Sequence, residues 1–347
     1  MATLKNQLLQ YIRARGNFNS AELMKRFNVS RQAVHRHLQV FLKDSTIIRQ
    51  GSSRRTTFYI VNTPRARIRA AAKAKSFKKR IRAKGSSEDH VLADLQSQEG
   101  LLAGLSESAL ENLQYSFTEM LNNAIDHSGS IFIDTEVLTD GGMFSFTVRD
   151  MGVGVFANIM NKLKLASEME AIEDLLKGKQ STDPARHSGE GIFFTSKIAD
   201  RFVLESHAKR LIVDNRLGDI FLEDIRFLKG TRVICEIDAS SKRKLADVFA
   251  EYTSEEFKFD RTRVTVKLFE SGESYVSRSQ AKRLLHSLER FREVVLDFSG
   301  VASVGQAFAD EIFRVFHAEH PGIRIEPINM SKNVEFMVRR AIAARKK

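Results

Sequence analysis

The chain has 347 residues, a formal net charge of +12, a single cysteine and no tryptophan. One cysteine excludes a disulfide scaffold and a cysteine-rich metal site. The N-terminal residues lack the apolar core of a signal peptide, and no window approaches the ~20 apolar residues of a membrane span. We therefore expect a cytoplasmic protein without membrane contact, long enough for two to three domains.

The positive charge is concentrated in the N-terminal quarter. Residues 1–84 carry 21 lysines and arginines against Glu22 and Asp44, a net charge of +19, whereas the remaining 263 residues carry −7. This asymmetry is typical of nucleic-acid contact, because neutralisation of the phosphate backbone dominates affinity.

Three short helices are predicted in this basic block. Apolar spacing places them at Leu4–Arg13, Ala21–Phe27 and Arg31–Lys43, with Ser20 and Ser30 as caps of the second and third. The third helix has an apolar side and a side rich in groups that hydrogen-bond to base edges and phosphates. These polar residues are Arg31, Gln32, His35, Arg36 and Gln39.

A hairpin is predicted to follow the three helices. Its strand candidates, Thr46–Gln50 and Thr56–Val61, are joined by a short loop that contains Arg54 and Arg55. Residues 1–62 resemble a winged helix-turn-helix DNA-binding domain. The resemblance implies double-stranded DNA as a partner, with Arg54 and Arg55 in the wing at the DNA-binding surface. The alternative is a protein-interaction module that uses the same fold without DNA.

Residues 63–87 are predicted to form a basic linker. They carry ten basic residues and no acidic one, with Pro64 at the start and Gly85 near the end. Such a run cannot bury a core by itself. The alanine-rich segment Ala70–Ala74 favours a helix once a partner neutralises the charge, so we expect a linker that stiffens on DNA.

A central helix that includes Phe117–Ser128 carries a carboxylate and an amide one turn apart. The apolar residues recur at helical spacing on a side that can face a sheet: Leu113, Phe117, Leu121 and Ala124. Glu119 and Asn123 lie on another face, which Asp126 extends. Asn123 offers a neutral oxygen to Mg²⁺, and Glu119 can deprotonate a water or hydroxyl. Glu119 is therefore the candidate catalytic residue.

Two glycine motifs follow this helix along the chain. Asp150 ends a predicted strand, Met143–Arg149, and Gly152 and Gly154 allow the next backbone segment to approach a base closely. The carboxylate of Asp150 suits the exocyclic amine of adenine. In isolation, an Asp-x-Gly-x-Gly motif is more often a tight turn.

The second motif opens another predicted helix, Ile192–Asp200. Gly189 and Gly191 precede it, so free N–H groups at its N-terminus are expected to face phosphates. Thr231 enters a further predicted strand, Arg232–Ile237, and adds a hydroxyl near the aspartate of the first motif.

These three motifs, in this order, resemble the GHKL ATPase superfamily of DNA gyrase and sensor histidine kinases, which has the Bergerat fold. The resemblance covers residues 88–240 and implies ATP with Mg²⁺ as cofactors. Glu119 is the implied catalytic residue and Asn123 the implied Mg²⁺ ligand. The implied nucleotide-binding residues are Asn123, Asp126, Asp150, Gly152, Gly154, Gly189, Glu190, Gly191, Ile192 and Thr231.

The resemblance also implies that Val155–Ser188 is a mobile lid over the phosphates. Four basic residues of this segment are candidates to reach a phosphate, although each is more often a solvated loop charge: Lys177, Lys179, Arg186 and His187.

The C-terminal third alternates predicted strands and helices. The strands are expected around Val264–Leu268, Val294–Phe298 and Ile323–Ile328, and the helices at Ser277–Phe291, Gln306–Glu319 and Asn333–Ala344. This order is typical of an α/β sandwich with helices on one face of a sheet. Residues 258–347 resemble the STAS-like relatives of anti-sigma-factor antagonists. Where that family places a phosphorylated serine, this chain has Ala307, which puts phosphorylation in doubt.

The expected fold class is therefore multidomain α/β: a winged helix-turn-helix, a Bergerat-fold α/β sandwich ATPase and a STAS-like α/β domain. Two functions stay open. The first is a DNA-binding regulator that ATP binding or hydrolysis switches. The second is a histidine- or serine-type protein kinase that acts on its own or a partner STAS-like domain. A protein partner of the STAS-like domain and a homodimer are further candidates.

Overall fold

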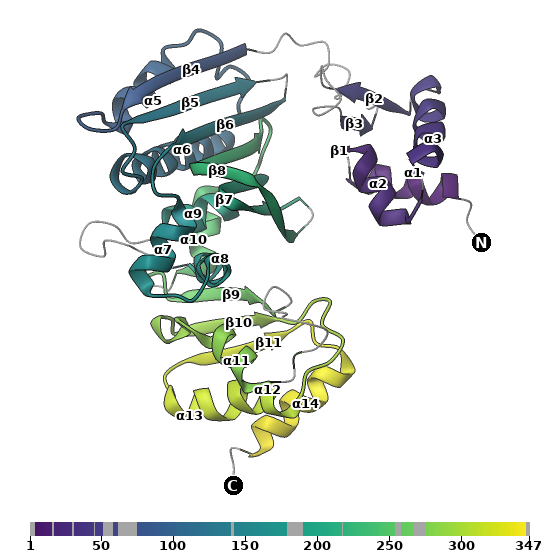
Figure 1. Cartoon of the computed structure of the whole chain (residues 1–347), viewed down its shortest axis with the longest axis vertical. Helices are drawn as coiled ribbons and strands as arrows, with labels where there is room; N and C mark the ends of the chain where they lie inside the picture. Colours follow the sequence, from purple (N-terminus) through teal and green to yellow (C-terminus); the bar gives the residue numbers. More distant parts are fainter. Residues whose placement is uncertain are drawn as a thin grey trace. The chain divides into compact units, whose positions relative to one another are not determined.

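The computed structural model describes most of the chain and divides it into two compact units (Figure 1). One unit comprises Met1–Ser76 with Leu138–Phe144, and the other comprises Phe77–Val137 with Ser145–Lys347. The described residues are 4–15, 17–29, 31–44, 46–50, 58–61, 75–139, 142–178, 190–216, 218–253, 258–266, 275 and 277–344.

The described part of the N-terminal unit contains three helices and a small antiparallel sheet in the order β1-β3-β2. Its elements are α1 (Leu4–Arg15), β1 (Asn17–Phe18), α2 (Ser20–Phe27), α3 (Arg31–Lys43), β2 (Ile47–Gln50) and β3 (Phe58–Val61). Leu8, Leu23 and Leu38, one from each helix, are buried together, and the ring of Phe18 stacks on that of Tyr59 at 5.7 Å. The sheet therefore shares the core of the helices.

The start of α2 corrects the predicted cap. Asn19, in extended backbone, is the N-cap, and its side-chain oxygen accepts a hydrogen bond of 2.9 Å from the Glu22 N–H. Ser20 is instead the first helical residue. An asparagine caps as well as a serine, so the two adjacent candidates could not be separated by residue type. Ser30 lies outside the described residues.

The second unit is built on a five-stranded sheet with the order β4-β5-β6-β8-β7. The strands are β4 (Lys75–Arg82), β5 (Phe132–Thr139), β6 (Met143–Asp150), β7 (Arg201–Asp214) and β8 (Asp219–Asp238). The helices of this part are α5 (Glu88–Gln96), α6 (Glu107–His127), α7 (Val155–Leu163), α8 (Glu168–Lys177), α9 (Gly191–Ile198) and α10 (Leu245–Tyr252). Helix α6 contacts both β8 and α9, and α9 in turn contacts β7, so both helices pack against the sheet.

Strand β4 shows that the predicted linker was wrong over Lys75–Arg82. This segment forms an edge strand of the sheet, with Phe77 and Ile81 buried. The basic side chains between them face outward, and Arg80 forms a two-point ion pair with Asp134 of β5, at 2.6 and 2.8 Å. Two apolar residues and cross-strand pairs are thus enough to hold a basic segment in the sheet. Residues 62–74, including Ala70–Ala74, lie outside the described residues.

The C-terminal third forms a parallel three-stranded sheet in the order β11-β10-β9. Its strands are β9 (Arg261–Thr265), β10 (Glu293–Asp297) and β11 (Arg324–Ile328). Its helical elements are α11 (Arg278–Leu285), the 3₁₀ turn Leu288–Arg290, α12 (Gln306–Asp310), a π-helical segment (Glu311–Phe316), α13 (His317–Glu319) and α14 (Lys332–Ala343). Figure 1 shows α12, α13 and α14 on one side of this sheet.

One hydrophobic core joins α9 and α10 to the C-terminal sheet. Phe193 and Phe194 of α9 are buried in the same cluster as Leu296 of β10 and Phe308 of α12. The ring of Phe259, just before β9, lies 4.9 Å from that of Phe193. The central and C-terminal parts therefore bury their apolar side chains against each other.

Candidate functional site

Helix α6 supports the first part of the candidate site. Ser106 caps it by accepting a hydrogen bond of 3.1 Å from the Ala109 N–H. Its apolar side is buried as the spacing predicted, whereas Glu119 and Asn123 are half-buried and Asp126 is exposed. The helix therefore presents a carboxylate and an amide on a side that is only partly covered.

The start of α9 lies directly against this pair. A Cβ atom added to Gly191 would overlap the Glu119 carboxylate and would lie 3.4 Å from Nδ2 of Asn123. A side chain at this position would displace the Glu119 carboxylate, so glycine allows the start of the helix to approach it this closely. The structure thus brings Glu119, Asn123 and Gly191 together, with the half-buried Glu190 and Ile192 on either side of Gly191. Gly189 lies outside the described residues.

Negative charge is concentrated at this junction. Tyr115, one turn before Glu119 on α6, has a raised pKa, first because it is buried and then because the charges of Glu119 and Glu190 disfavour a phenolate. The charges of Glu119 and Glu190 therefore both raise the pKa of the Tyr115 phenol. A cation bound here would be attracted by the same two charges.

Asp150 forms the second part of the site, at the end of β6. Its side chain is buried, and Oδ1 accepts hydrogen bonds from the N–H groups of Gly152 at 2.8 Å and Thr231 at 3.2 Å. The Thr231 hydroxyl in turn accepts a bond of 3.0 Å from the Val155 N–H. Burial raises the pKa of Asp150, and these hydrogen bonds only partly oppose the shift. The carboxylate is therefore fixed in position and poorly solvated.

The loop after Asp150 packs against the end of α6. The Val153 N–H donates a hydrogen bond of 2.9 Å to the carbonyl of Ser128. A Cβ atom on Gly152 would overlap that carbonyl, so the close approach requires glycine. Gly154, at the N-cap of α7, is buried. The loop and the end of α6 thus pack directly against each other.

His207 is a neighbour of this loop that sequence reasoning missed. A Cβ atom on Gly154 would lie 2.7 Å from its Nε2, while its Nδ1 is 2.7 Å from the Glu168 carboxylate. Its ring stacks on that of Phe227 at 5.3 Å, and its φ is +52°. No local pattern marks a single histidine within a long strand, so only the folded chain shows its position.

The segment expected to be a mobile lid contains two helices, α7 and α8, in its described part. Lys177, a candidate phosphate contact or a solvated loop charge, is instead 2% exposed and forms an ion pair of 3.1 Å with Asp174. It also donates hydrogen bonds to the carbonyls of Arg283 and His286 in the C-terminal domain. Neither expectation holds for Lys177, because tertiary packing turns its side chain away from solvent. Lys179, Arg186 and His187 lie outside the described residues.

The candidate DNA-binding face lies on α3. Val34 and Leu38 are buried, whereas His35, Arg36 and Gln39 are exposed on the other side. Arg31 and Gln32 lie in the first turn of the same helix. Arg54 and Arg55 are outside the described residues. Helix α3 therefore keeps three predicted contact residues accessible together.

Neither a protein-only metal site nor a membrane-spanning helix occurs within the described ranges. No group of three His, Cys, Asp or Glu side chains there is placed to hold a metal ion alone. Mg²⁺ in nucleotide sites is usually held by one or two protein ligands together with phosphate oxygens, and Asn123 fits that smaller role. No helix in the described part of the chain combines the length and apolar character needed to cross a membrane.

Three family models match the chain in the predicted order. Residues 4–46 match an HTH domain, residues 82–215 a histidine kinase-like ATPase domain, and residues 280–335 a STAS-like domain of unknown function. A search of curated proteins found no significant match. The chain thus combines helix-turn-helix, ATPase-like and STAS-like domains, which confirms the predicted architecture and multidomain α/β fold.

Proposed function

We propose that this protein is a DNA-binding regulator in which ATP and Mg²⁺ at the ATPase-like domain switch the binding of DNA or of a protein partner. The observation that carries the proposal is the meeting of Glu119 and Asn123 with the start of α9 at Gly191. A carboxylate, an amide and a helix N-terminus at one place suit a metal-bound triphosphate.

Each residue then has a distinct role. Asp150 accepts the exocyclic amine of adenine, since its carboxylate is fixed by backbone N–H groups. Asn123 provides a neutral oxygen to Mg²⁺, and the free N–H groups at the start of α9 face the phosphates. Glu119 orients or deprotonates the attacking water.

The fold supports a route from this site to the STAS-like domain. Helix α9 begins beside Glu119 and carries Phe193 and Phe194, which lie in the core that the STAS-like domain shares. A shift of α9 when nucleotide binds would therefore alter packing in both domains. A ligand changes such an equilibrium only if it binds the two conformations unequally.

Reciprocal titration tests the proposal. We expect DNA affinity to differ between the nucleotide-free protein and the protein saturated with a non-hydrolysable ATP analogue, by about 1–3 kcal/mol. DNA must then change the affinity for the analogue by the same factor. Titrations without any mutual effect would contradict the switch.

Incubation with γ-labelled ATP separates the switch from the protein kinase alternative. Release of free phosphate without protein labelling supports a hydrolytic switch. Stable label on the chain, or on an added STAS-like protein, would favour the kinase.

A further inference from the structure

A cavity of about 660 Å³ lies between the ATPase-like and STAS-like domains, within the second compact unit. Four elements contribute to its wall: Lys197 of α9, Tyr252 of α10, Phe221 of the β7–β8 hairpin and Thr265 of β9. Asp297, at the end of β10, also lines it. Parallel sheets commonly bind ligands at the carboxyl ends of their strands, where β9 and β10 end here. The volume matches that of small-molecule sites.

Two cations of this cavity have no carboxylate partner among the described residues. The Lys197 ammonium lies 5.2 Å from the ring centre of Phe193 and 5.8 Å from that of Tyr252, and it forms no ion pair within this part of the chain. Burial lowers its pKa to about 8, although the charge of Glu251 opposes the shift. An ammonium that has lost water without gaining a counter-ion would be stabilised by an anion.

The second cation is Arg243. Its Nη1 donates to the carbonyls of Lys197 at 2.7 Å and of Ala199 at 3.3 Å, which fixes the guanidinium at the last turn of α9. It has no ion pair with any described carboxylate. A guanidinium has five N–H donors, so others remain for a ligand.

Three of the four acidic side chains in the wall, Asp219, Asp247 and Glu251, are exposed, whereas Lys197 and Arg243 are half-buried. The fourth, Asp297, is buried and is paired with Arg263 at 2.6 Å. Apart from this pair, the charge changes from negative near solvent to positive inside. Exposed carboxylates disfavour nucleic acid or a nucleoside triphosphate, which are polyanions, whereas a single anionic group can reach the inner cations.

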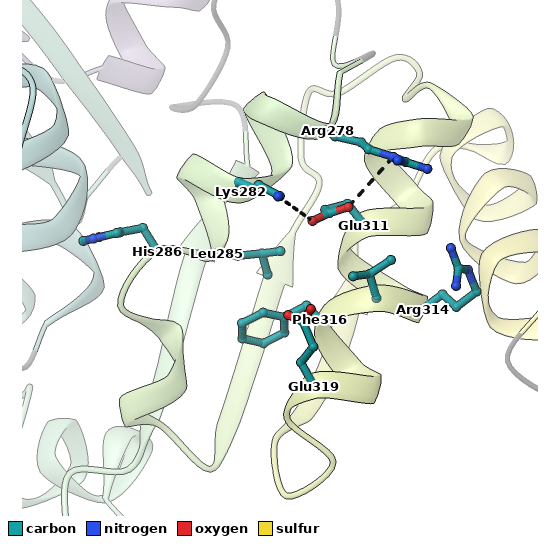
Figure 2. A pocket seen from close by; sticks show the side chains of 9 residues that line it. Arg278, Lys282, Leu285, His286, Glu311, Arg314, Phe316 and Glu319 are labelled. Atoms are coloured by element: carbon teal, nitrogen blue, oxygen red, sulfur yellow. Dashed lines mark ion pairs between the residues drawn. The ribbon is translucent and has the colours of Figure 1, made fainter.

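The cations in the pocket of the STAS-like domain in Figure 2, by contrast, have carboxylate partners. Its volume is about 470 Å³, and the Glu311 carboxylate lies between Arg278 at 4.0 Å and Lys282 at 3.8 Å. A third cation, Arg314, is paired with Asp310 at 2.6 Å. These cations already have carboxylate partners, so this pocket does not favour an anion.

We propose that the cavity between the ATPase-like and STAS-like domains binds a small organic anion, whose carboxylate or phosphate group is held by Lys197 and Arg243. The apolar body of the ligand lies against Tyr252 and Phe221. Lys197 and Gly191 belong to the same helix, so a ligand bound in the cavity would also affect the position of the start of α9. This last link rests on the proposed nucleotide function.

Calorimetry with two probes of the same apolar body tests the site in the full chain. Benzoate carries a carboxylate and phenyl phosphate carries a phosphate, so the pair identifies the preferred anionic group. We expect one of them to bind in the submillimolar range. Lys197→Met should weaken that binding by about 10- to 100-fold, the loss expected for a charge-assisted hydrogen bond.

Three controls accompany these titrations. Lys197→Arg keeps the charge and should retain most of the affinity. Lys244→Met changes an exposed lysine that does not line the cavity and should bind like the wild type. Asp150→Ala should also leave probe binding unchanged, because this variant tests only the nucleotide site.

Two results would overturn the proposed site. One is that neither probe binds the wild type at millimolar concentration, and the other is that Lys197→Met binds as tightly as the wild type. If Lys197→Met does not fold, Arg243→Gln takes its place with the same expected loss. Failure of ATP to bind would contradict the nucleotide function but not this anion site.

Discussion

The Nζ atom of Lys177 in the ATPase-like domain donates a hydrogen bond of 2.8 Å to the main-chain carbonyl of His286 in the STAS-like domain. The same amine pairs with Asp174, whose other carboxylate oxygen accepts a bond of 2.9 Å from Ser287. A charged lysine is thus almost completely buried where the domains meet. Burial lowers its pKa, and the charge of Asp174 opposes that shift.

Lys177→Met is expected to destabilise the second unit strongly. The substitution keeps the apolar stem but removes one partner of a buried ion pair, while Ser287 and His286 remain beside Asp174. Breaking a buried pair in this way typically costs about 3–5 kcal/mol. Urea unfolding would measure the loss. Lys162→Met, a change at an exposed lysine of α7, should alter the free energy of unfolding by less than about 0.5 kcal/mol. Equal effects of the two changes would show that the buried pair contributes little.

Glu173 should make the stability of this interface dependent on pH. Burial raises its pKa to about 7, although Lys177 and Arg283 oppose the shift. Between its ordinary pKa and about 7 the folded protein holds a proton that the unfolded chain has released, so stability falls as pH rises through this range. Glu173→Gln should therefore stabilise the protein at pH ~8, by about 1–2 kcal/mol, and much less at pH ~5. A gain that is equal at both pH values would assign the effect to packing.

Asp150 should select adenine and make ATP binding sensitive to acid. Asp150→Ala should abolish binding of ATP, and GTP should compete poorly with ATP in the wild type. Because the pKa of Asp150 is raised, its carboxylate takes up a proton above the usual range for aspartate. ATP affinity should then have its full value at pH values above that pKa and fall as the pH drops through it. Calorimetry measures both effects, with the exposed Asp89→Ala on α5 as control. Equal affinities for GTP and ATP would contradict the role of Asp150 in adenine selection.

Glu119 should affect turnover more than binding. If it is the general base, Glu119→Ala keeps ATP affinity within a few-fold but lowers hydrolysis by roughly 10²–10⁴-fold. Asn123→Ala should instead remove the Mg²⁺ dependence of binding. Glu111→Ala, at an exposed position of the same helix, provides the matched control in a phosphate-release assay. Wild-type turnover in Glu119→Ala would mean that another group is the base.

DNA binding should depend steeply on salt and on the exposed face of α3. Arg36→Ala is expected to cost about 1–3 kcal/mol at a specific site and less on random duplex. Gel shifts over a salt series would measure this, with the exposed Arg339 of α14 replaced by alanine as control. A deletion that removes the N-terminal domain should end at residue 74, because β4 begins at Lys75. Undiminished DNA binding by the deleted protein would place the contact elsewhere.

Sequence reasoning could place Glu119 and Asn123 on one side of a helix because the two residues occur at helical spacing within a single element. The burial of Phe117 beside the half-exposed Glu119 follows from helical period alone. The contact between Gly191 and Glu119 joins segments far apart in the chain. It could be predicted only because the three motifs, in their order, resemble the GHKL ATPase superfamily. The position of Lys177 carried no such signal, because lysines are rarely buried and two of its hydrogen-bond acceptors, the carbonyls of Arg283 and His286, lie far away in the chain.

Strand β4 was missed for a related reason. An edge strand with one solvated face can hold its place with few apolar residues, and here only Phe77 and Ile81 are buried apolar residues within it. Its basic residues resemble a linker until Asp134 and Glu136 of the neighbouring strand are placed opposite them. Cross-strand pairing is a property of two segments, so it cannot be read from one.

The core that Phe193 and Phe194 share with the STAS-like domain affects how the two domains can be exchanged in evolution as well as how they fold. Each partner completes the other's interior, so neither can be exchanged alone without exposing aromatic surface. The two domains should melt in a single cooperative transition. A recombination event that transplanted only one of them would expose this aromatic surface and so favour aggregation, which favours the transfer of the two domains together.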